Sequence, residues 1–157
     1  MANVTLSGYL ASAISIAWAG ASQKIDSLTD NEWSDLSDEI DNSTNKYYLA
    51  DLDLALGSAA FTGSDAGIEV YIVQTVDGTN YPDWTGNTTS EAPEQSHYFV
   101  AFMPLTAATA ARRVVSSSQS PVKMPNGKFK FGIRSRANVT LAGSGNTLYY
   151  RPHSLSI

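Results

Sequence analysis

A strict alternation of residue types near the C-terminus constrains the fold of this chain more than any other feature. Between residues 128 and 134, every second residue is apolar and the residues between them are basic or glycine. Such a period of 2 places the two kinds of side chain on opposite faces of an extended chain, as in a half-buried strand. A Gly/Ser/Asn-rich turn at residues 142–146 then leads to a second strand through Leu148 and Tyr150. The expected inward residues are Phe129, Phe131 and Ile133, and the expected outward residues are Lys128, Lys130 and Arg134.

Similar strands are predicted along the rest of the chain. Residues 48–56 and 68–76 alternate between apolar and polar, and residues 110–117 form a more polar strand. Residues 97–105 are apolar on both faces, which predicts a central strand. About seven to nine short strands separated by turn signals predict an all-β fold, an antiparallel jelly-roll-like β-sandwich. We expect one domain, residues 1–157, with residues 1–20 as an N-terminal arm or first strand.

Residues 29–42 allow a helix or a turn followed by a strand. Trp33, Leu36 and Ile40 have helical spacing, and Asp30 suits an N-cap. Serine and aspartate are poor residues for a helix interior, however, and the segment ends in a turn-forming Asn-Ser-Thr-Asn run. We therefore predict a turn and a short strand near Leu36–Ile40.

The composition fits one domain held together by burial. The chain has 157 residues, of which 43% are hydrophobic, so a substantial core is expected. It has no cysteine, so neither disulfides nor thiolate metal sites can hold the fold.

The two halves of the chain carry opposite charge. Residues 1–94 hold all 15 acidic residues and two basic ones, a formal charge of −13, whereas residues 95–157 hold eight basic residues and none that is acidic. Strands of the two halves interleave in a sandwich, so we expect these charges to compensate inside the fold or between subunits. The net charge of −5 argues against nucleic acid as a partner.

The N-terminal residues 3–20 are apolar but match no targeting signal. No basic residue precedes Lys24, so the basic region of a signal peptide is missing, and four serine and glycine residues make the run too polar for a membrane span. We expect a retained, soluble arm that does not enter a membrane. It is either the first strand of the domain or an extended contact with another surface. The candidate contact residues are Leu6, Tyr9, Leu10, Ile14, Ile16 and Trp18.

Constellations for catalysis are missing from the sequence. Neither His97 nor His153 lies in a catalytic motif, and no zinc-protease, phosphate-binding or dinucleotide-binding motif occurs. The acidic run at residues 30–41 lacks the spacing of a calcium loop and is interpreted as a solvated face. We expect no enzyme, no cofactor and no metal site.

Two aromatic residues of the long polar loop at 79–96 allow a second kind of site. Tyr81 and Trp84 would suit a stacking platform for sugar rings, although an aromatic residue in a loop more often anchors its own loop or an interface.

The C-terminal run resembles a family of viral proteins. Pro125-Asn126-Gly127, Phe129–Arg136, Ala142–Thr147 and Arg151-Pro152 are similar to the last two strands of small jelly-roll capsid decoration proteins of tailed bacteriophages, which are also called head-stabilising or cement proteins. The resemblance extends over residues 36–155. Its upstream parts are Ile40–Asn42, Tyr48–Ser58 and Ile68–Trp84.

The resemblance implies a non-enzymatic structural protein on the outer surface of the virion, made in the host cytoplasm. Such a protein bridges neighbouring subunits of the major capsid protein against the internal pressure of DNA, as a homotrimer at local symmetry axes. A carbohydrate-binding module on a phage particle or cell surface is the alternative, and it rests on Tyr81 and Trp84.

Overall fold

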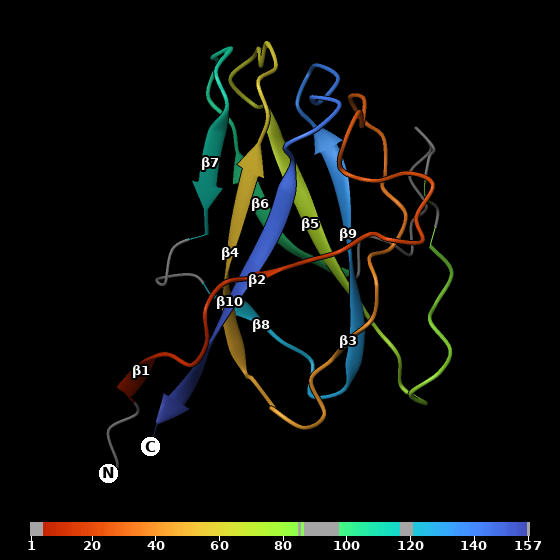
Figure 1. The fold of residues 1–157 in the computed structure, drawn as a ribbon, viewed down its shortest axis with the longest axis vertical. Helices are drawn as coiled ribbons and strands as arrows, with labels where there is room; N and C mark the ends of the chain where they lie inside the picture. Colours follow the sequence, from red (N-terminus) through yellow and green to blue (C-terminus); the bar gives the residue numbers. More distant parts are fainter. Residues whose placement is uncertain (1–4, 85, 87–97, 117–120, 157) are drawn as a thin grey trace.

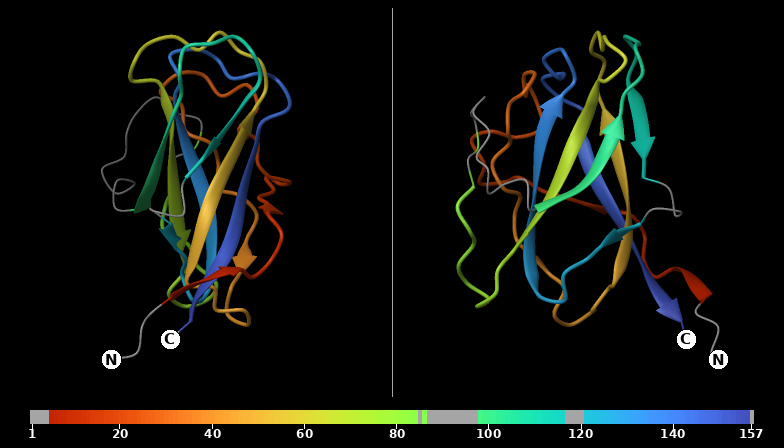
Figure 2. Two further views of the ribbon diagram at one scale, coloured as in Figure 1. Left: turned by 90° about the vertical axis from the view of Figure 1, so that its left-hand side faces the viewer. Right: turned by 180° about the vertical axis from the view of Figure 1, so that it is seen from behind.

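The chain forms two antiparallel sheets packed face to face, as Figures 1 and 2 show. The structure is a computed structural model that describes residues 5–84, 86, 98–116 and 121–156. Sheet A has six strands and sheet B has four. The strands are β1 (Thr5–Tyr9), β2 (Ile14–Ser15), β3 (Ile40–Asp41), β4 (Leu49–Leu56), β5 (Gly67–Gln74), β6 (Phe99–Pro104), β7 (Arg112–Val115), β8 (Val122–Lys123), β9 (Lys128–Arg136) and β10 (Thr147–Ser156).

The strand order confirms the predicted jelly roll. Sheet A runs β1-β10-β4-β7, and sheet B runs β3-β9-β5-β6. The short strands β2 and β8 lie off these paths, on β10 and β4. The remaining eight strands divide between the sheets in the interleaved order of two Greek keys, which defines a jelly roll. The first and last strands are therefore neighbours in sheet A.

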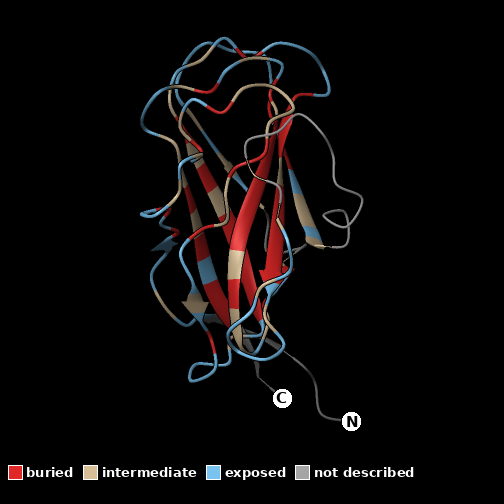
Figure 3. Cartoon of the chain, turned by 90° about the vertical axis from the view of Figure 1, so that its right-hand side faces the viewer, coloured by how far each residue is buried: buried red, intermediate tan, exposed pale blue. Residues whose placement is uncertain are grey.

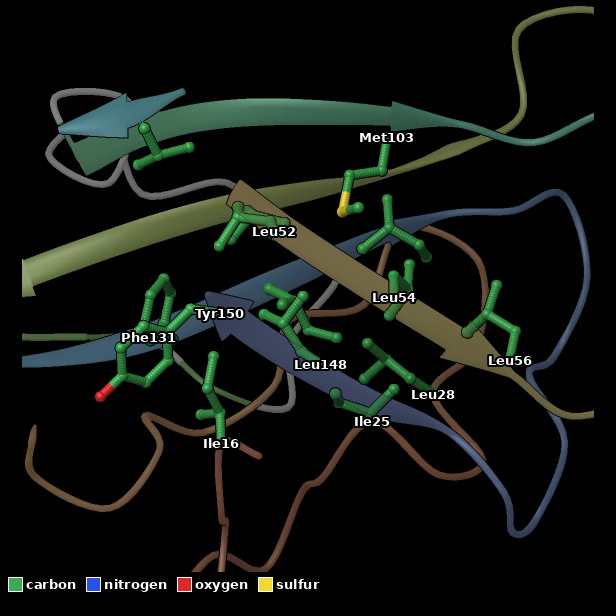
Figure 4. Packing of buried hydrophobic residues seen from close by; sticks show 14 of the residues in the cluster. Ile16, Ile25, Leu28, Leu52, Leu54, Leu56, Met103, Phe131, Leu148 and Tyr150 are labelled. Carbon is green, nitrogen blue, oxygen red and sulfur yellow. The ribbon is translucent and has the colours of Figure 1, made fainter. Parts of the chain in front are cut away.

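The core lies between the sheets and is built by the alternating strands. Ala50, Leu52, Leu54 and Leu56 of β4 face the apolar residues of β9. Leu148 and Tyr150 of β10 complete this layer, as Figure 4 shows. Figure 3 shows that burial continues along most of the strand length. The inward positions predicted for β9 are fully buried, namely Phe129, Phe131 and Ile133.

The N-terminal segment is part of this sandwich. β1 pairs with β10 through Leu6↔Leu155 and Tyr9↔His153, and β2 pairs with β10 through Ile14↔Tyr150. Of the two interpretations of residues 3–20, the structure thus shows a strand of the domain's own sheet. β1 and the end of β10 nevertheless project beyond the body of the sandwich as a two-stranded ribbon (Figure 1).

Two strand predictions were wrong in their placement. Residues 97–105 were expected to form a central strand, but β6 is the edge of sheet B, and Phe99 and Phe102 are exposed. Because β6 has a neighbouring strand on one side only, some of its apolar side chains stay exposed. The strand predicted for residues 68–76 ends at Gln74, and Val76 is 96% exposed.

Residues 29–39 form no helix and run beside β9 as extended coil. Main-chain amides of Ser34 and Ser37 donate to the carbonyls of Ile133 and Phe131. The hydroxyls of these two serines accept the Ile133 and Phe131 amides in return. Serine, a poor residue for a helix interior, thus supplies the edge pairing of β9, and the predicted strand near Leu36–Ile40 is reduced to β3.

Candidate contact surface

The outer face of sheet B is covered by the chain itself. On β5 and β9 the outward residues Tyr71 and Gly132 lie opposite each other. Trp33 lies over them from the coil beside β9 and Trp84 lies over them from the long loop, with ring centroids 5.0 Å and 5.7 Å from that of Tyr71. Trp33 is fully buried although it lies outside the sandwich core. We call this surface, with Glu69 and Arg134, the covered face.

Trp84 is held in place by backbone and ring contacts. Its indole nitrogen donates to the Ser34 carbonyl over 2.7 Å, and its ring lies 5.4 Å from Trp33 in an edge-on arrangement. A side chain at Gly132 would collide with this ring, since a Cβ there would lie 2.2 Å from it. Glycine at position 132 therefore makes room for the tryptophan.

Tyr81 is anchored on the same side of the molecule. Its hydroxyl donates to Glu39 over 3.0 Å, and the ammonium of Lys130 lies 4.7 Å from its ring centroid. Burial and the hydrogen bond to Glu39 raise the pKa of Tyr81 far above its ordinary value. Both predicted platform residues thus hold their own loop against β9.

Charged groups on the covered face pair across β5 and β9. The Glu69 carboxylate accepts from the Tyr71 hydroxyl over 2.8 Å. It also lies 3.6 Å from Arg134 and 3.4 Å from Arg136. The Arg134 guanidinium lies 5.2 Å from the Trp33 ring and is itself buried. The outward Arg134 of the alternating strand is thus a structural residue.

The outer face of sheet A is different, because aromatic and arginine side chains lie at its surface. Tyr149 of β10 pairs with Asp53 of β4, which pairs in turn with Val115 of β7. The Arg113 guanidinium binds Asp53 and lies 5.6 Å from the Tyr149 ring. Val115 is 57% exposed. We call this surface the open face, and it consists of Asp53, Arg113, Val115, Tyr149 and Arg151.

Tyr9 closes one end of the open face over the buried side chains of His153 and Asp51. Its hydroxyl donates to Asp51 over 2.8 Å, and its ring stacks on the Arg151 guanidinium at 3.7 Å. Behind it His153 and Asp51 are both buried, with Nε2 and Oδ1 3.6 Å apart. The hydrogen bond to Asp51 raises the pKa of Tyr9. The predicted structural role of His153 agrees with this position, whereas His97 lies outside the described residues.

The candidate residues of the N-terminal segment divide into two groups. Ile16 and Trp18 belong to the core, and the Trp18 indole donates to the Asp35 carbonyl. Their side chains are therefore unavailable to a partner. Tyr9 and Leu10 are each 49% exposed, and Ile14 is 36% exposed. Leu6 lies in β1, opposite Leu155.

The open face was missed in the sequence. Tyr149 and Arg151 alternate with the buried Leu148 and Tyr150, so the period-2 pattern of β10 was the available signal. Arg113 and Val115 show the same alternation in β7. The pattern does not show that β10 pairs with β4 and β4 with β7, and this pairing brings the side chains together.

The charges of the two halves compensate within one chain. Arg113 pairs with Asp53, Lys128 with Glu39, and Glu69 with two arginines. Each pair joins a basic residue of the C-terminal half to an acidic residue of the N-terminal half. For these pairs, the first of the two predicted alternatives, compensation inside the fold, is therefore what the structure shows.

The acidic run at residues 30–41 organises the loop that contains it. Asp35 accepts the main-chain amides of Ser22 and Gln23, and Asp38 accepts that of Ala19. Carboxylates in this run thus accept amides outside regular structure, while Asp38, Glu39 and Asp41 remain exposed, as expected for a solvated acidic face. Across the residues that the structure describes, no group of His, Asp or Glu side chains is arranged to hold a metal ion.

Comparisons with known proteins add no identity. No family model, no curated protein and no solved structure matches this chain. In the described ranges, the structure has no helix of the length and hydrophobicity needed to span a membrane.

Proposed function

We propose that this chain is a non-enzymatic structural protein of a bacteriophage virion, which decorates the outer capsid surface and bridges neighbouring subunits of the major capsid protein. The resemblance of residues 36–155 to capsid decoration proteins supports the proposal, and the jelly-roll strand order agrees with it.

The observation on which the proposal rests is the projecting ribbon of β1 and the end of β10 (Figure 1). An isolated two-stranded ribbon is at most marginally stable in water. At its base Tyr9 and Leu10 are half exposed, and Ile14 adds a third apolar side chain on the next short strand. A partner that covers this ribbon would bury these side chains and hold its two strands in place.

The open face continues from this base and has the composition of a binding surface. Tyrosine and arginine are enriched among the residues that dominate binding energy at protein interfaces. Arg113 and Arg151 are each stacked on a tyrosine ring, which orders these long side chains before any partner arrives. We therefore place the capsid contact on the ribbon base and the open face.

Assembly as a homotrimer is part of the proposal. Because the charged pairs are satisfied within one chain, opposite charge in the two halves gives little support to subunit pairing. The trimer is therefore proposed on the resemblance alone, as a head-to-tail ring of three.

Binding to undecorated capsids of the same virus tests the proposal. Deletion of residues 2–20 would remove the core residues Ile16 and Trp18, so the arm is tested by the double substitution Leu10→Ser and Ile14→Ser. The open face is tested by Arg113→Ala with Tyr149→Ala. Val76→Ser is the matched control, since Val76 is an exposed apolar residue outside both surfaces.

We expect both double variants to lose co-sedimentation with capsids while Val76→Ser keeps it. Unchanged binding of both double variants, with folded structure verified by circular dichroism, would contradict the proposal. A glycan array with the same preparations tests the carbohydrate-binding alternative, which the packing of Trp84 against Gly132 does not favour.

A further inference from the structure

The turn between β8 and β9 contains the only Asn-Gly dipeptide of the sequence, Asn126-Gly127. Asn126 is exposed, and its side chain makes no hydrogen bond with the parts of the chain that the structure describes. Around Gly127 the space is open, because a Cβ placed there would meet no atom within 4 Å. The amide side chain is therefore unshielded, and within the described parts of the chain the Gly127 nitrogen donates no hydrogen bond.

We propose that Asn126 is a site of spontaneous deamidation that converts this turn to isoaspartate and aspartate. The peptide nitrogen of Gly127 loses its proton and attacks the side-chain carbonyl carbon of Asn126. A C–N bond forms, ammonia leaves, and the product is a five-membered succinimide. Water then opens the ring at either carbonyl, which gives isoaspartate or aspartate and adds one negative charge. The missing side chain of glycine removes the steric barrier to the first step.

The chain contains an internal contrast at Asp77-Gly78. Ring closure there requires a neutral carboxyl group, since an ionised carboxylate is a poor electrophile. The Asp77 carboxylate accepts the main-chain amides of Asn80 and Thr79 and the Thr75 hydroxyl. These hydrogen bonds, that of Asn80 first, hold the pKa of Asp77 well below its ordinary value and keep it charged. Of the one Asn-Gly and the one Asp-Gly dipeptide of the sequence, only Asn126-Gly127 is open to the reaction.

Isoaspartate at position 126 would disturb a buried anchor. Asn42 is 3% exposed, and it spans the turn with two bonds. Its side-chain nitrogen donates to the Pro125 carbonyl over 2.6 Å, and its main-chain nitrogen donates to the Gly127 carbonyl over 3.2 Å. Isoaspartate inserts one methylene into the main chain between these two carbonyls. Both bonds cannot keep their length, so the β3–β9 end of sheet B should loosen.

Peptide mapping by mass spectrometry tests this inference on the full-length folded chain incubated at mildly alkaline pH. The expected result is a time-dependent mass gain in the peptide that contains Asn126, with release of ammonia and with methyl transfer by an isoaspartyl methyltransferase. Asn126→Ala should abolish the signal. Gly127→Ala should slow it, and this variant should fold because the structure has room for the added methyl group.

The peptide that contains Asp77 is the control in the same digest and should keep its mass and accept no methyl group. Conversion of Asn126 in denatured chains but not in folded chains would overturn the inference, as would equal rates for the Gly127→Ala and unmodified chains. For the consequence, isoaspartate-containing molecules should unfold at lower denaturant than molecules with aspartate at 126. Equal denaturation midpoints would show that the added methylene does not weaken the hydrogen bonds between Asn42 and the turn.

Discussion

The two outer faces of this sandwich use the same kinds of residue for different purposes. The covered face of sheet B has tyrosine, tryptophan and arginine, and the open face of sheet A has tyrosine and arginine. On sheet B these side chains lie under Trp33 and Trp84, whereas on sheet A Arg113 and Arg151 remain exposed. The difference lies in the chain segments that cross each face, not in the composition of the strands.

This contrast shows where a partner has something left to bury. When segments of the same chain cover an aromatic surface, the burial of that surface stabilises the fold. The open face and the ribbon base stay exposed, so their burial by a partner would stabilise a complex. Substitutions on the covered face should therefore change stability, and substitutions on the open face should change binding.

Trp33→Ala should give the largest loss of stability. Trp33 is fully buried between Tyr71, Trp84 and Arg134. Removal of a large buried aromatic side chain costs about 3–5 kcal/mol. Urea denaturation measures the change in the free energy of unfolding. Val115→Ala on the open face is the control and should stay within about 0.5 kcal/mol of the unmodified chain. A Trp33→Ala variant as stable as this control would show that the face is not covered.

Gly132→Ala should displace Trp84 and lower stability less. The new Cβ would lie 2.2 Å from the Trp84 ring, so the ring has to move. Overpacking of this kind costs up to about 3 kcal/mol. Gly20→Ala is matched to it, because a Cβ at Gly20 meets no atom within 4 Å. Equal stability of the two variants would refute the contact, and tryptophan fluorescence should change only for Gly132→Ala.

The strands of this fold were predictable from sequence where one face is apolar and the other is not. The alternation located β4, β5, β9 and β10, because burial of one face leaves a period of 2. It misplaced β6 because an apolar strand at the edge of a sheet and one in its centre have the same sequence pattern. The two-residue strands β2 and β8 are too short to show any period.

The candidate surfaces were less predictable because both depend on contacts between distant residues. Trp33 and Trp84 lie in separate loops, and nothing local to either tryptophan reveals that Gly132 receives the Trp84 ring. Tyr9 was recognised as apolar, but its hydroxyl bond to Asp51 depends on the pairing of β1 with β10 and of β10 with β4. Residue type indicated an aromatic contact in each case, and topology decided whether the contact was internal.

Glu69→Gln should have a smaller effect than the glycine substitution. The variant keeps the shape of the side chain but removes the charge that lies beside Arg134 and Arg136. Loss of a hydrogen-bonded charge partner for a buried arginine costs about 1.5 kcal/mol. Asp53→Asn removes the corresponding partner of Arg113 on the open face, where solvent screens the pair, and should leave the denaturation midpoint unchanged. Equal shifts of the midpoint for both variants would contradict the distinction between the faces.

The smallest expected effect is a loss of stability at alkaline pH, to which one tyrosine on each side contributes. The pKa of Tyr9 is raised by its hydrogen bond to Asp51, and the pKa of Tyr81 is raised by burial and then by Glu39. A tyrosine whose pKa is higher in the folded than in the unfolded chain stabilises the fold fully below its unfolded pKa of about 10, and this stabilisation declines as the pH rises further. Stability should therefore fall above about pH 10. Tyr81→Phe should flatten this fall more than Tyr9→Phe, because Tyr9 is half exposed and solvent weakens its interaction with Asp51. Urea midpoints measured across the alkaline range test this order, and a fall that persists undiminished in the double variant would rule out both tyrosines as its source.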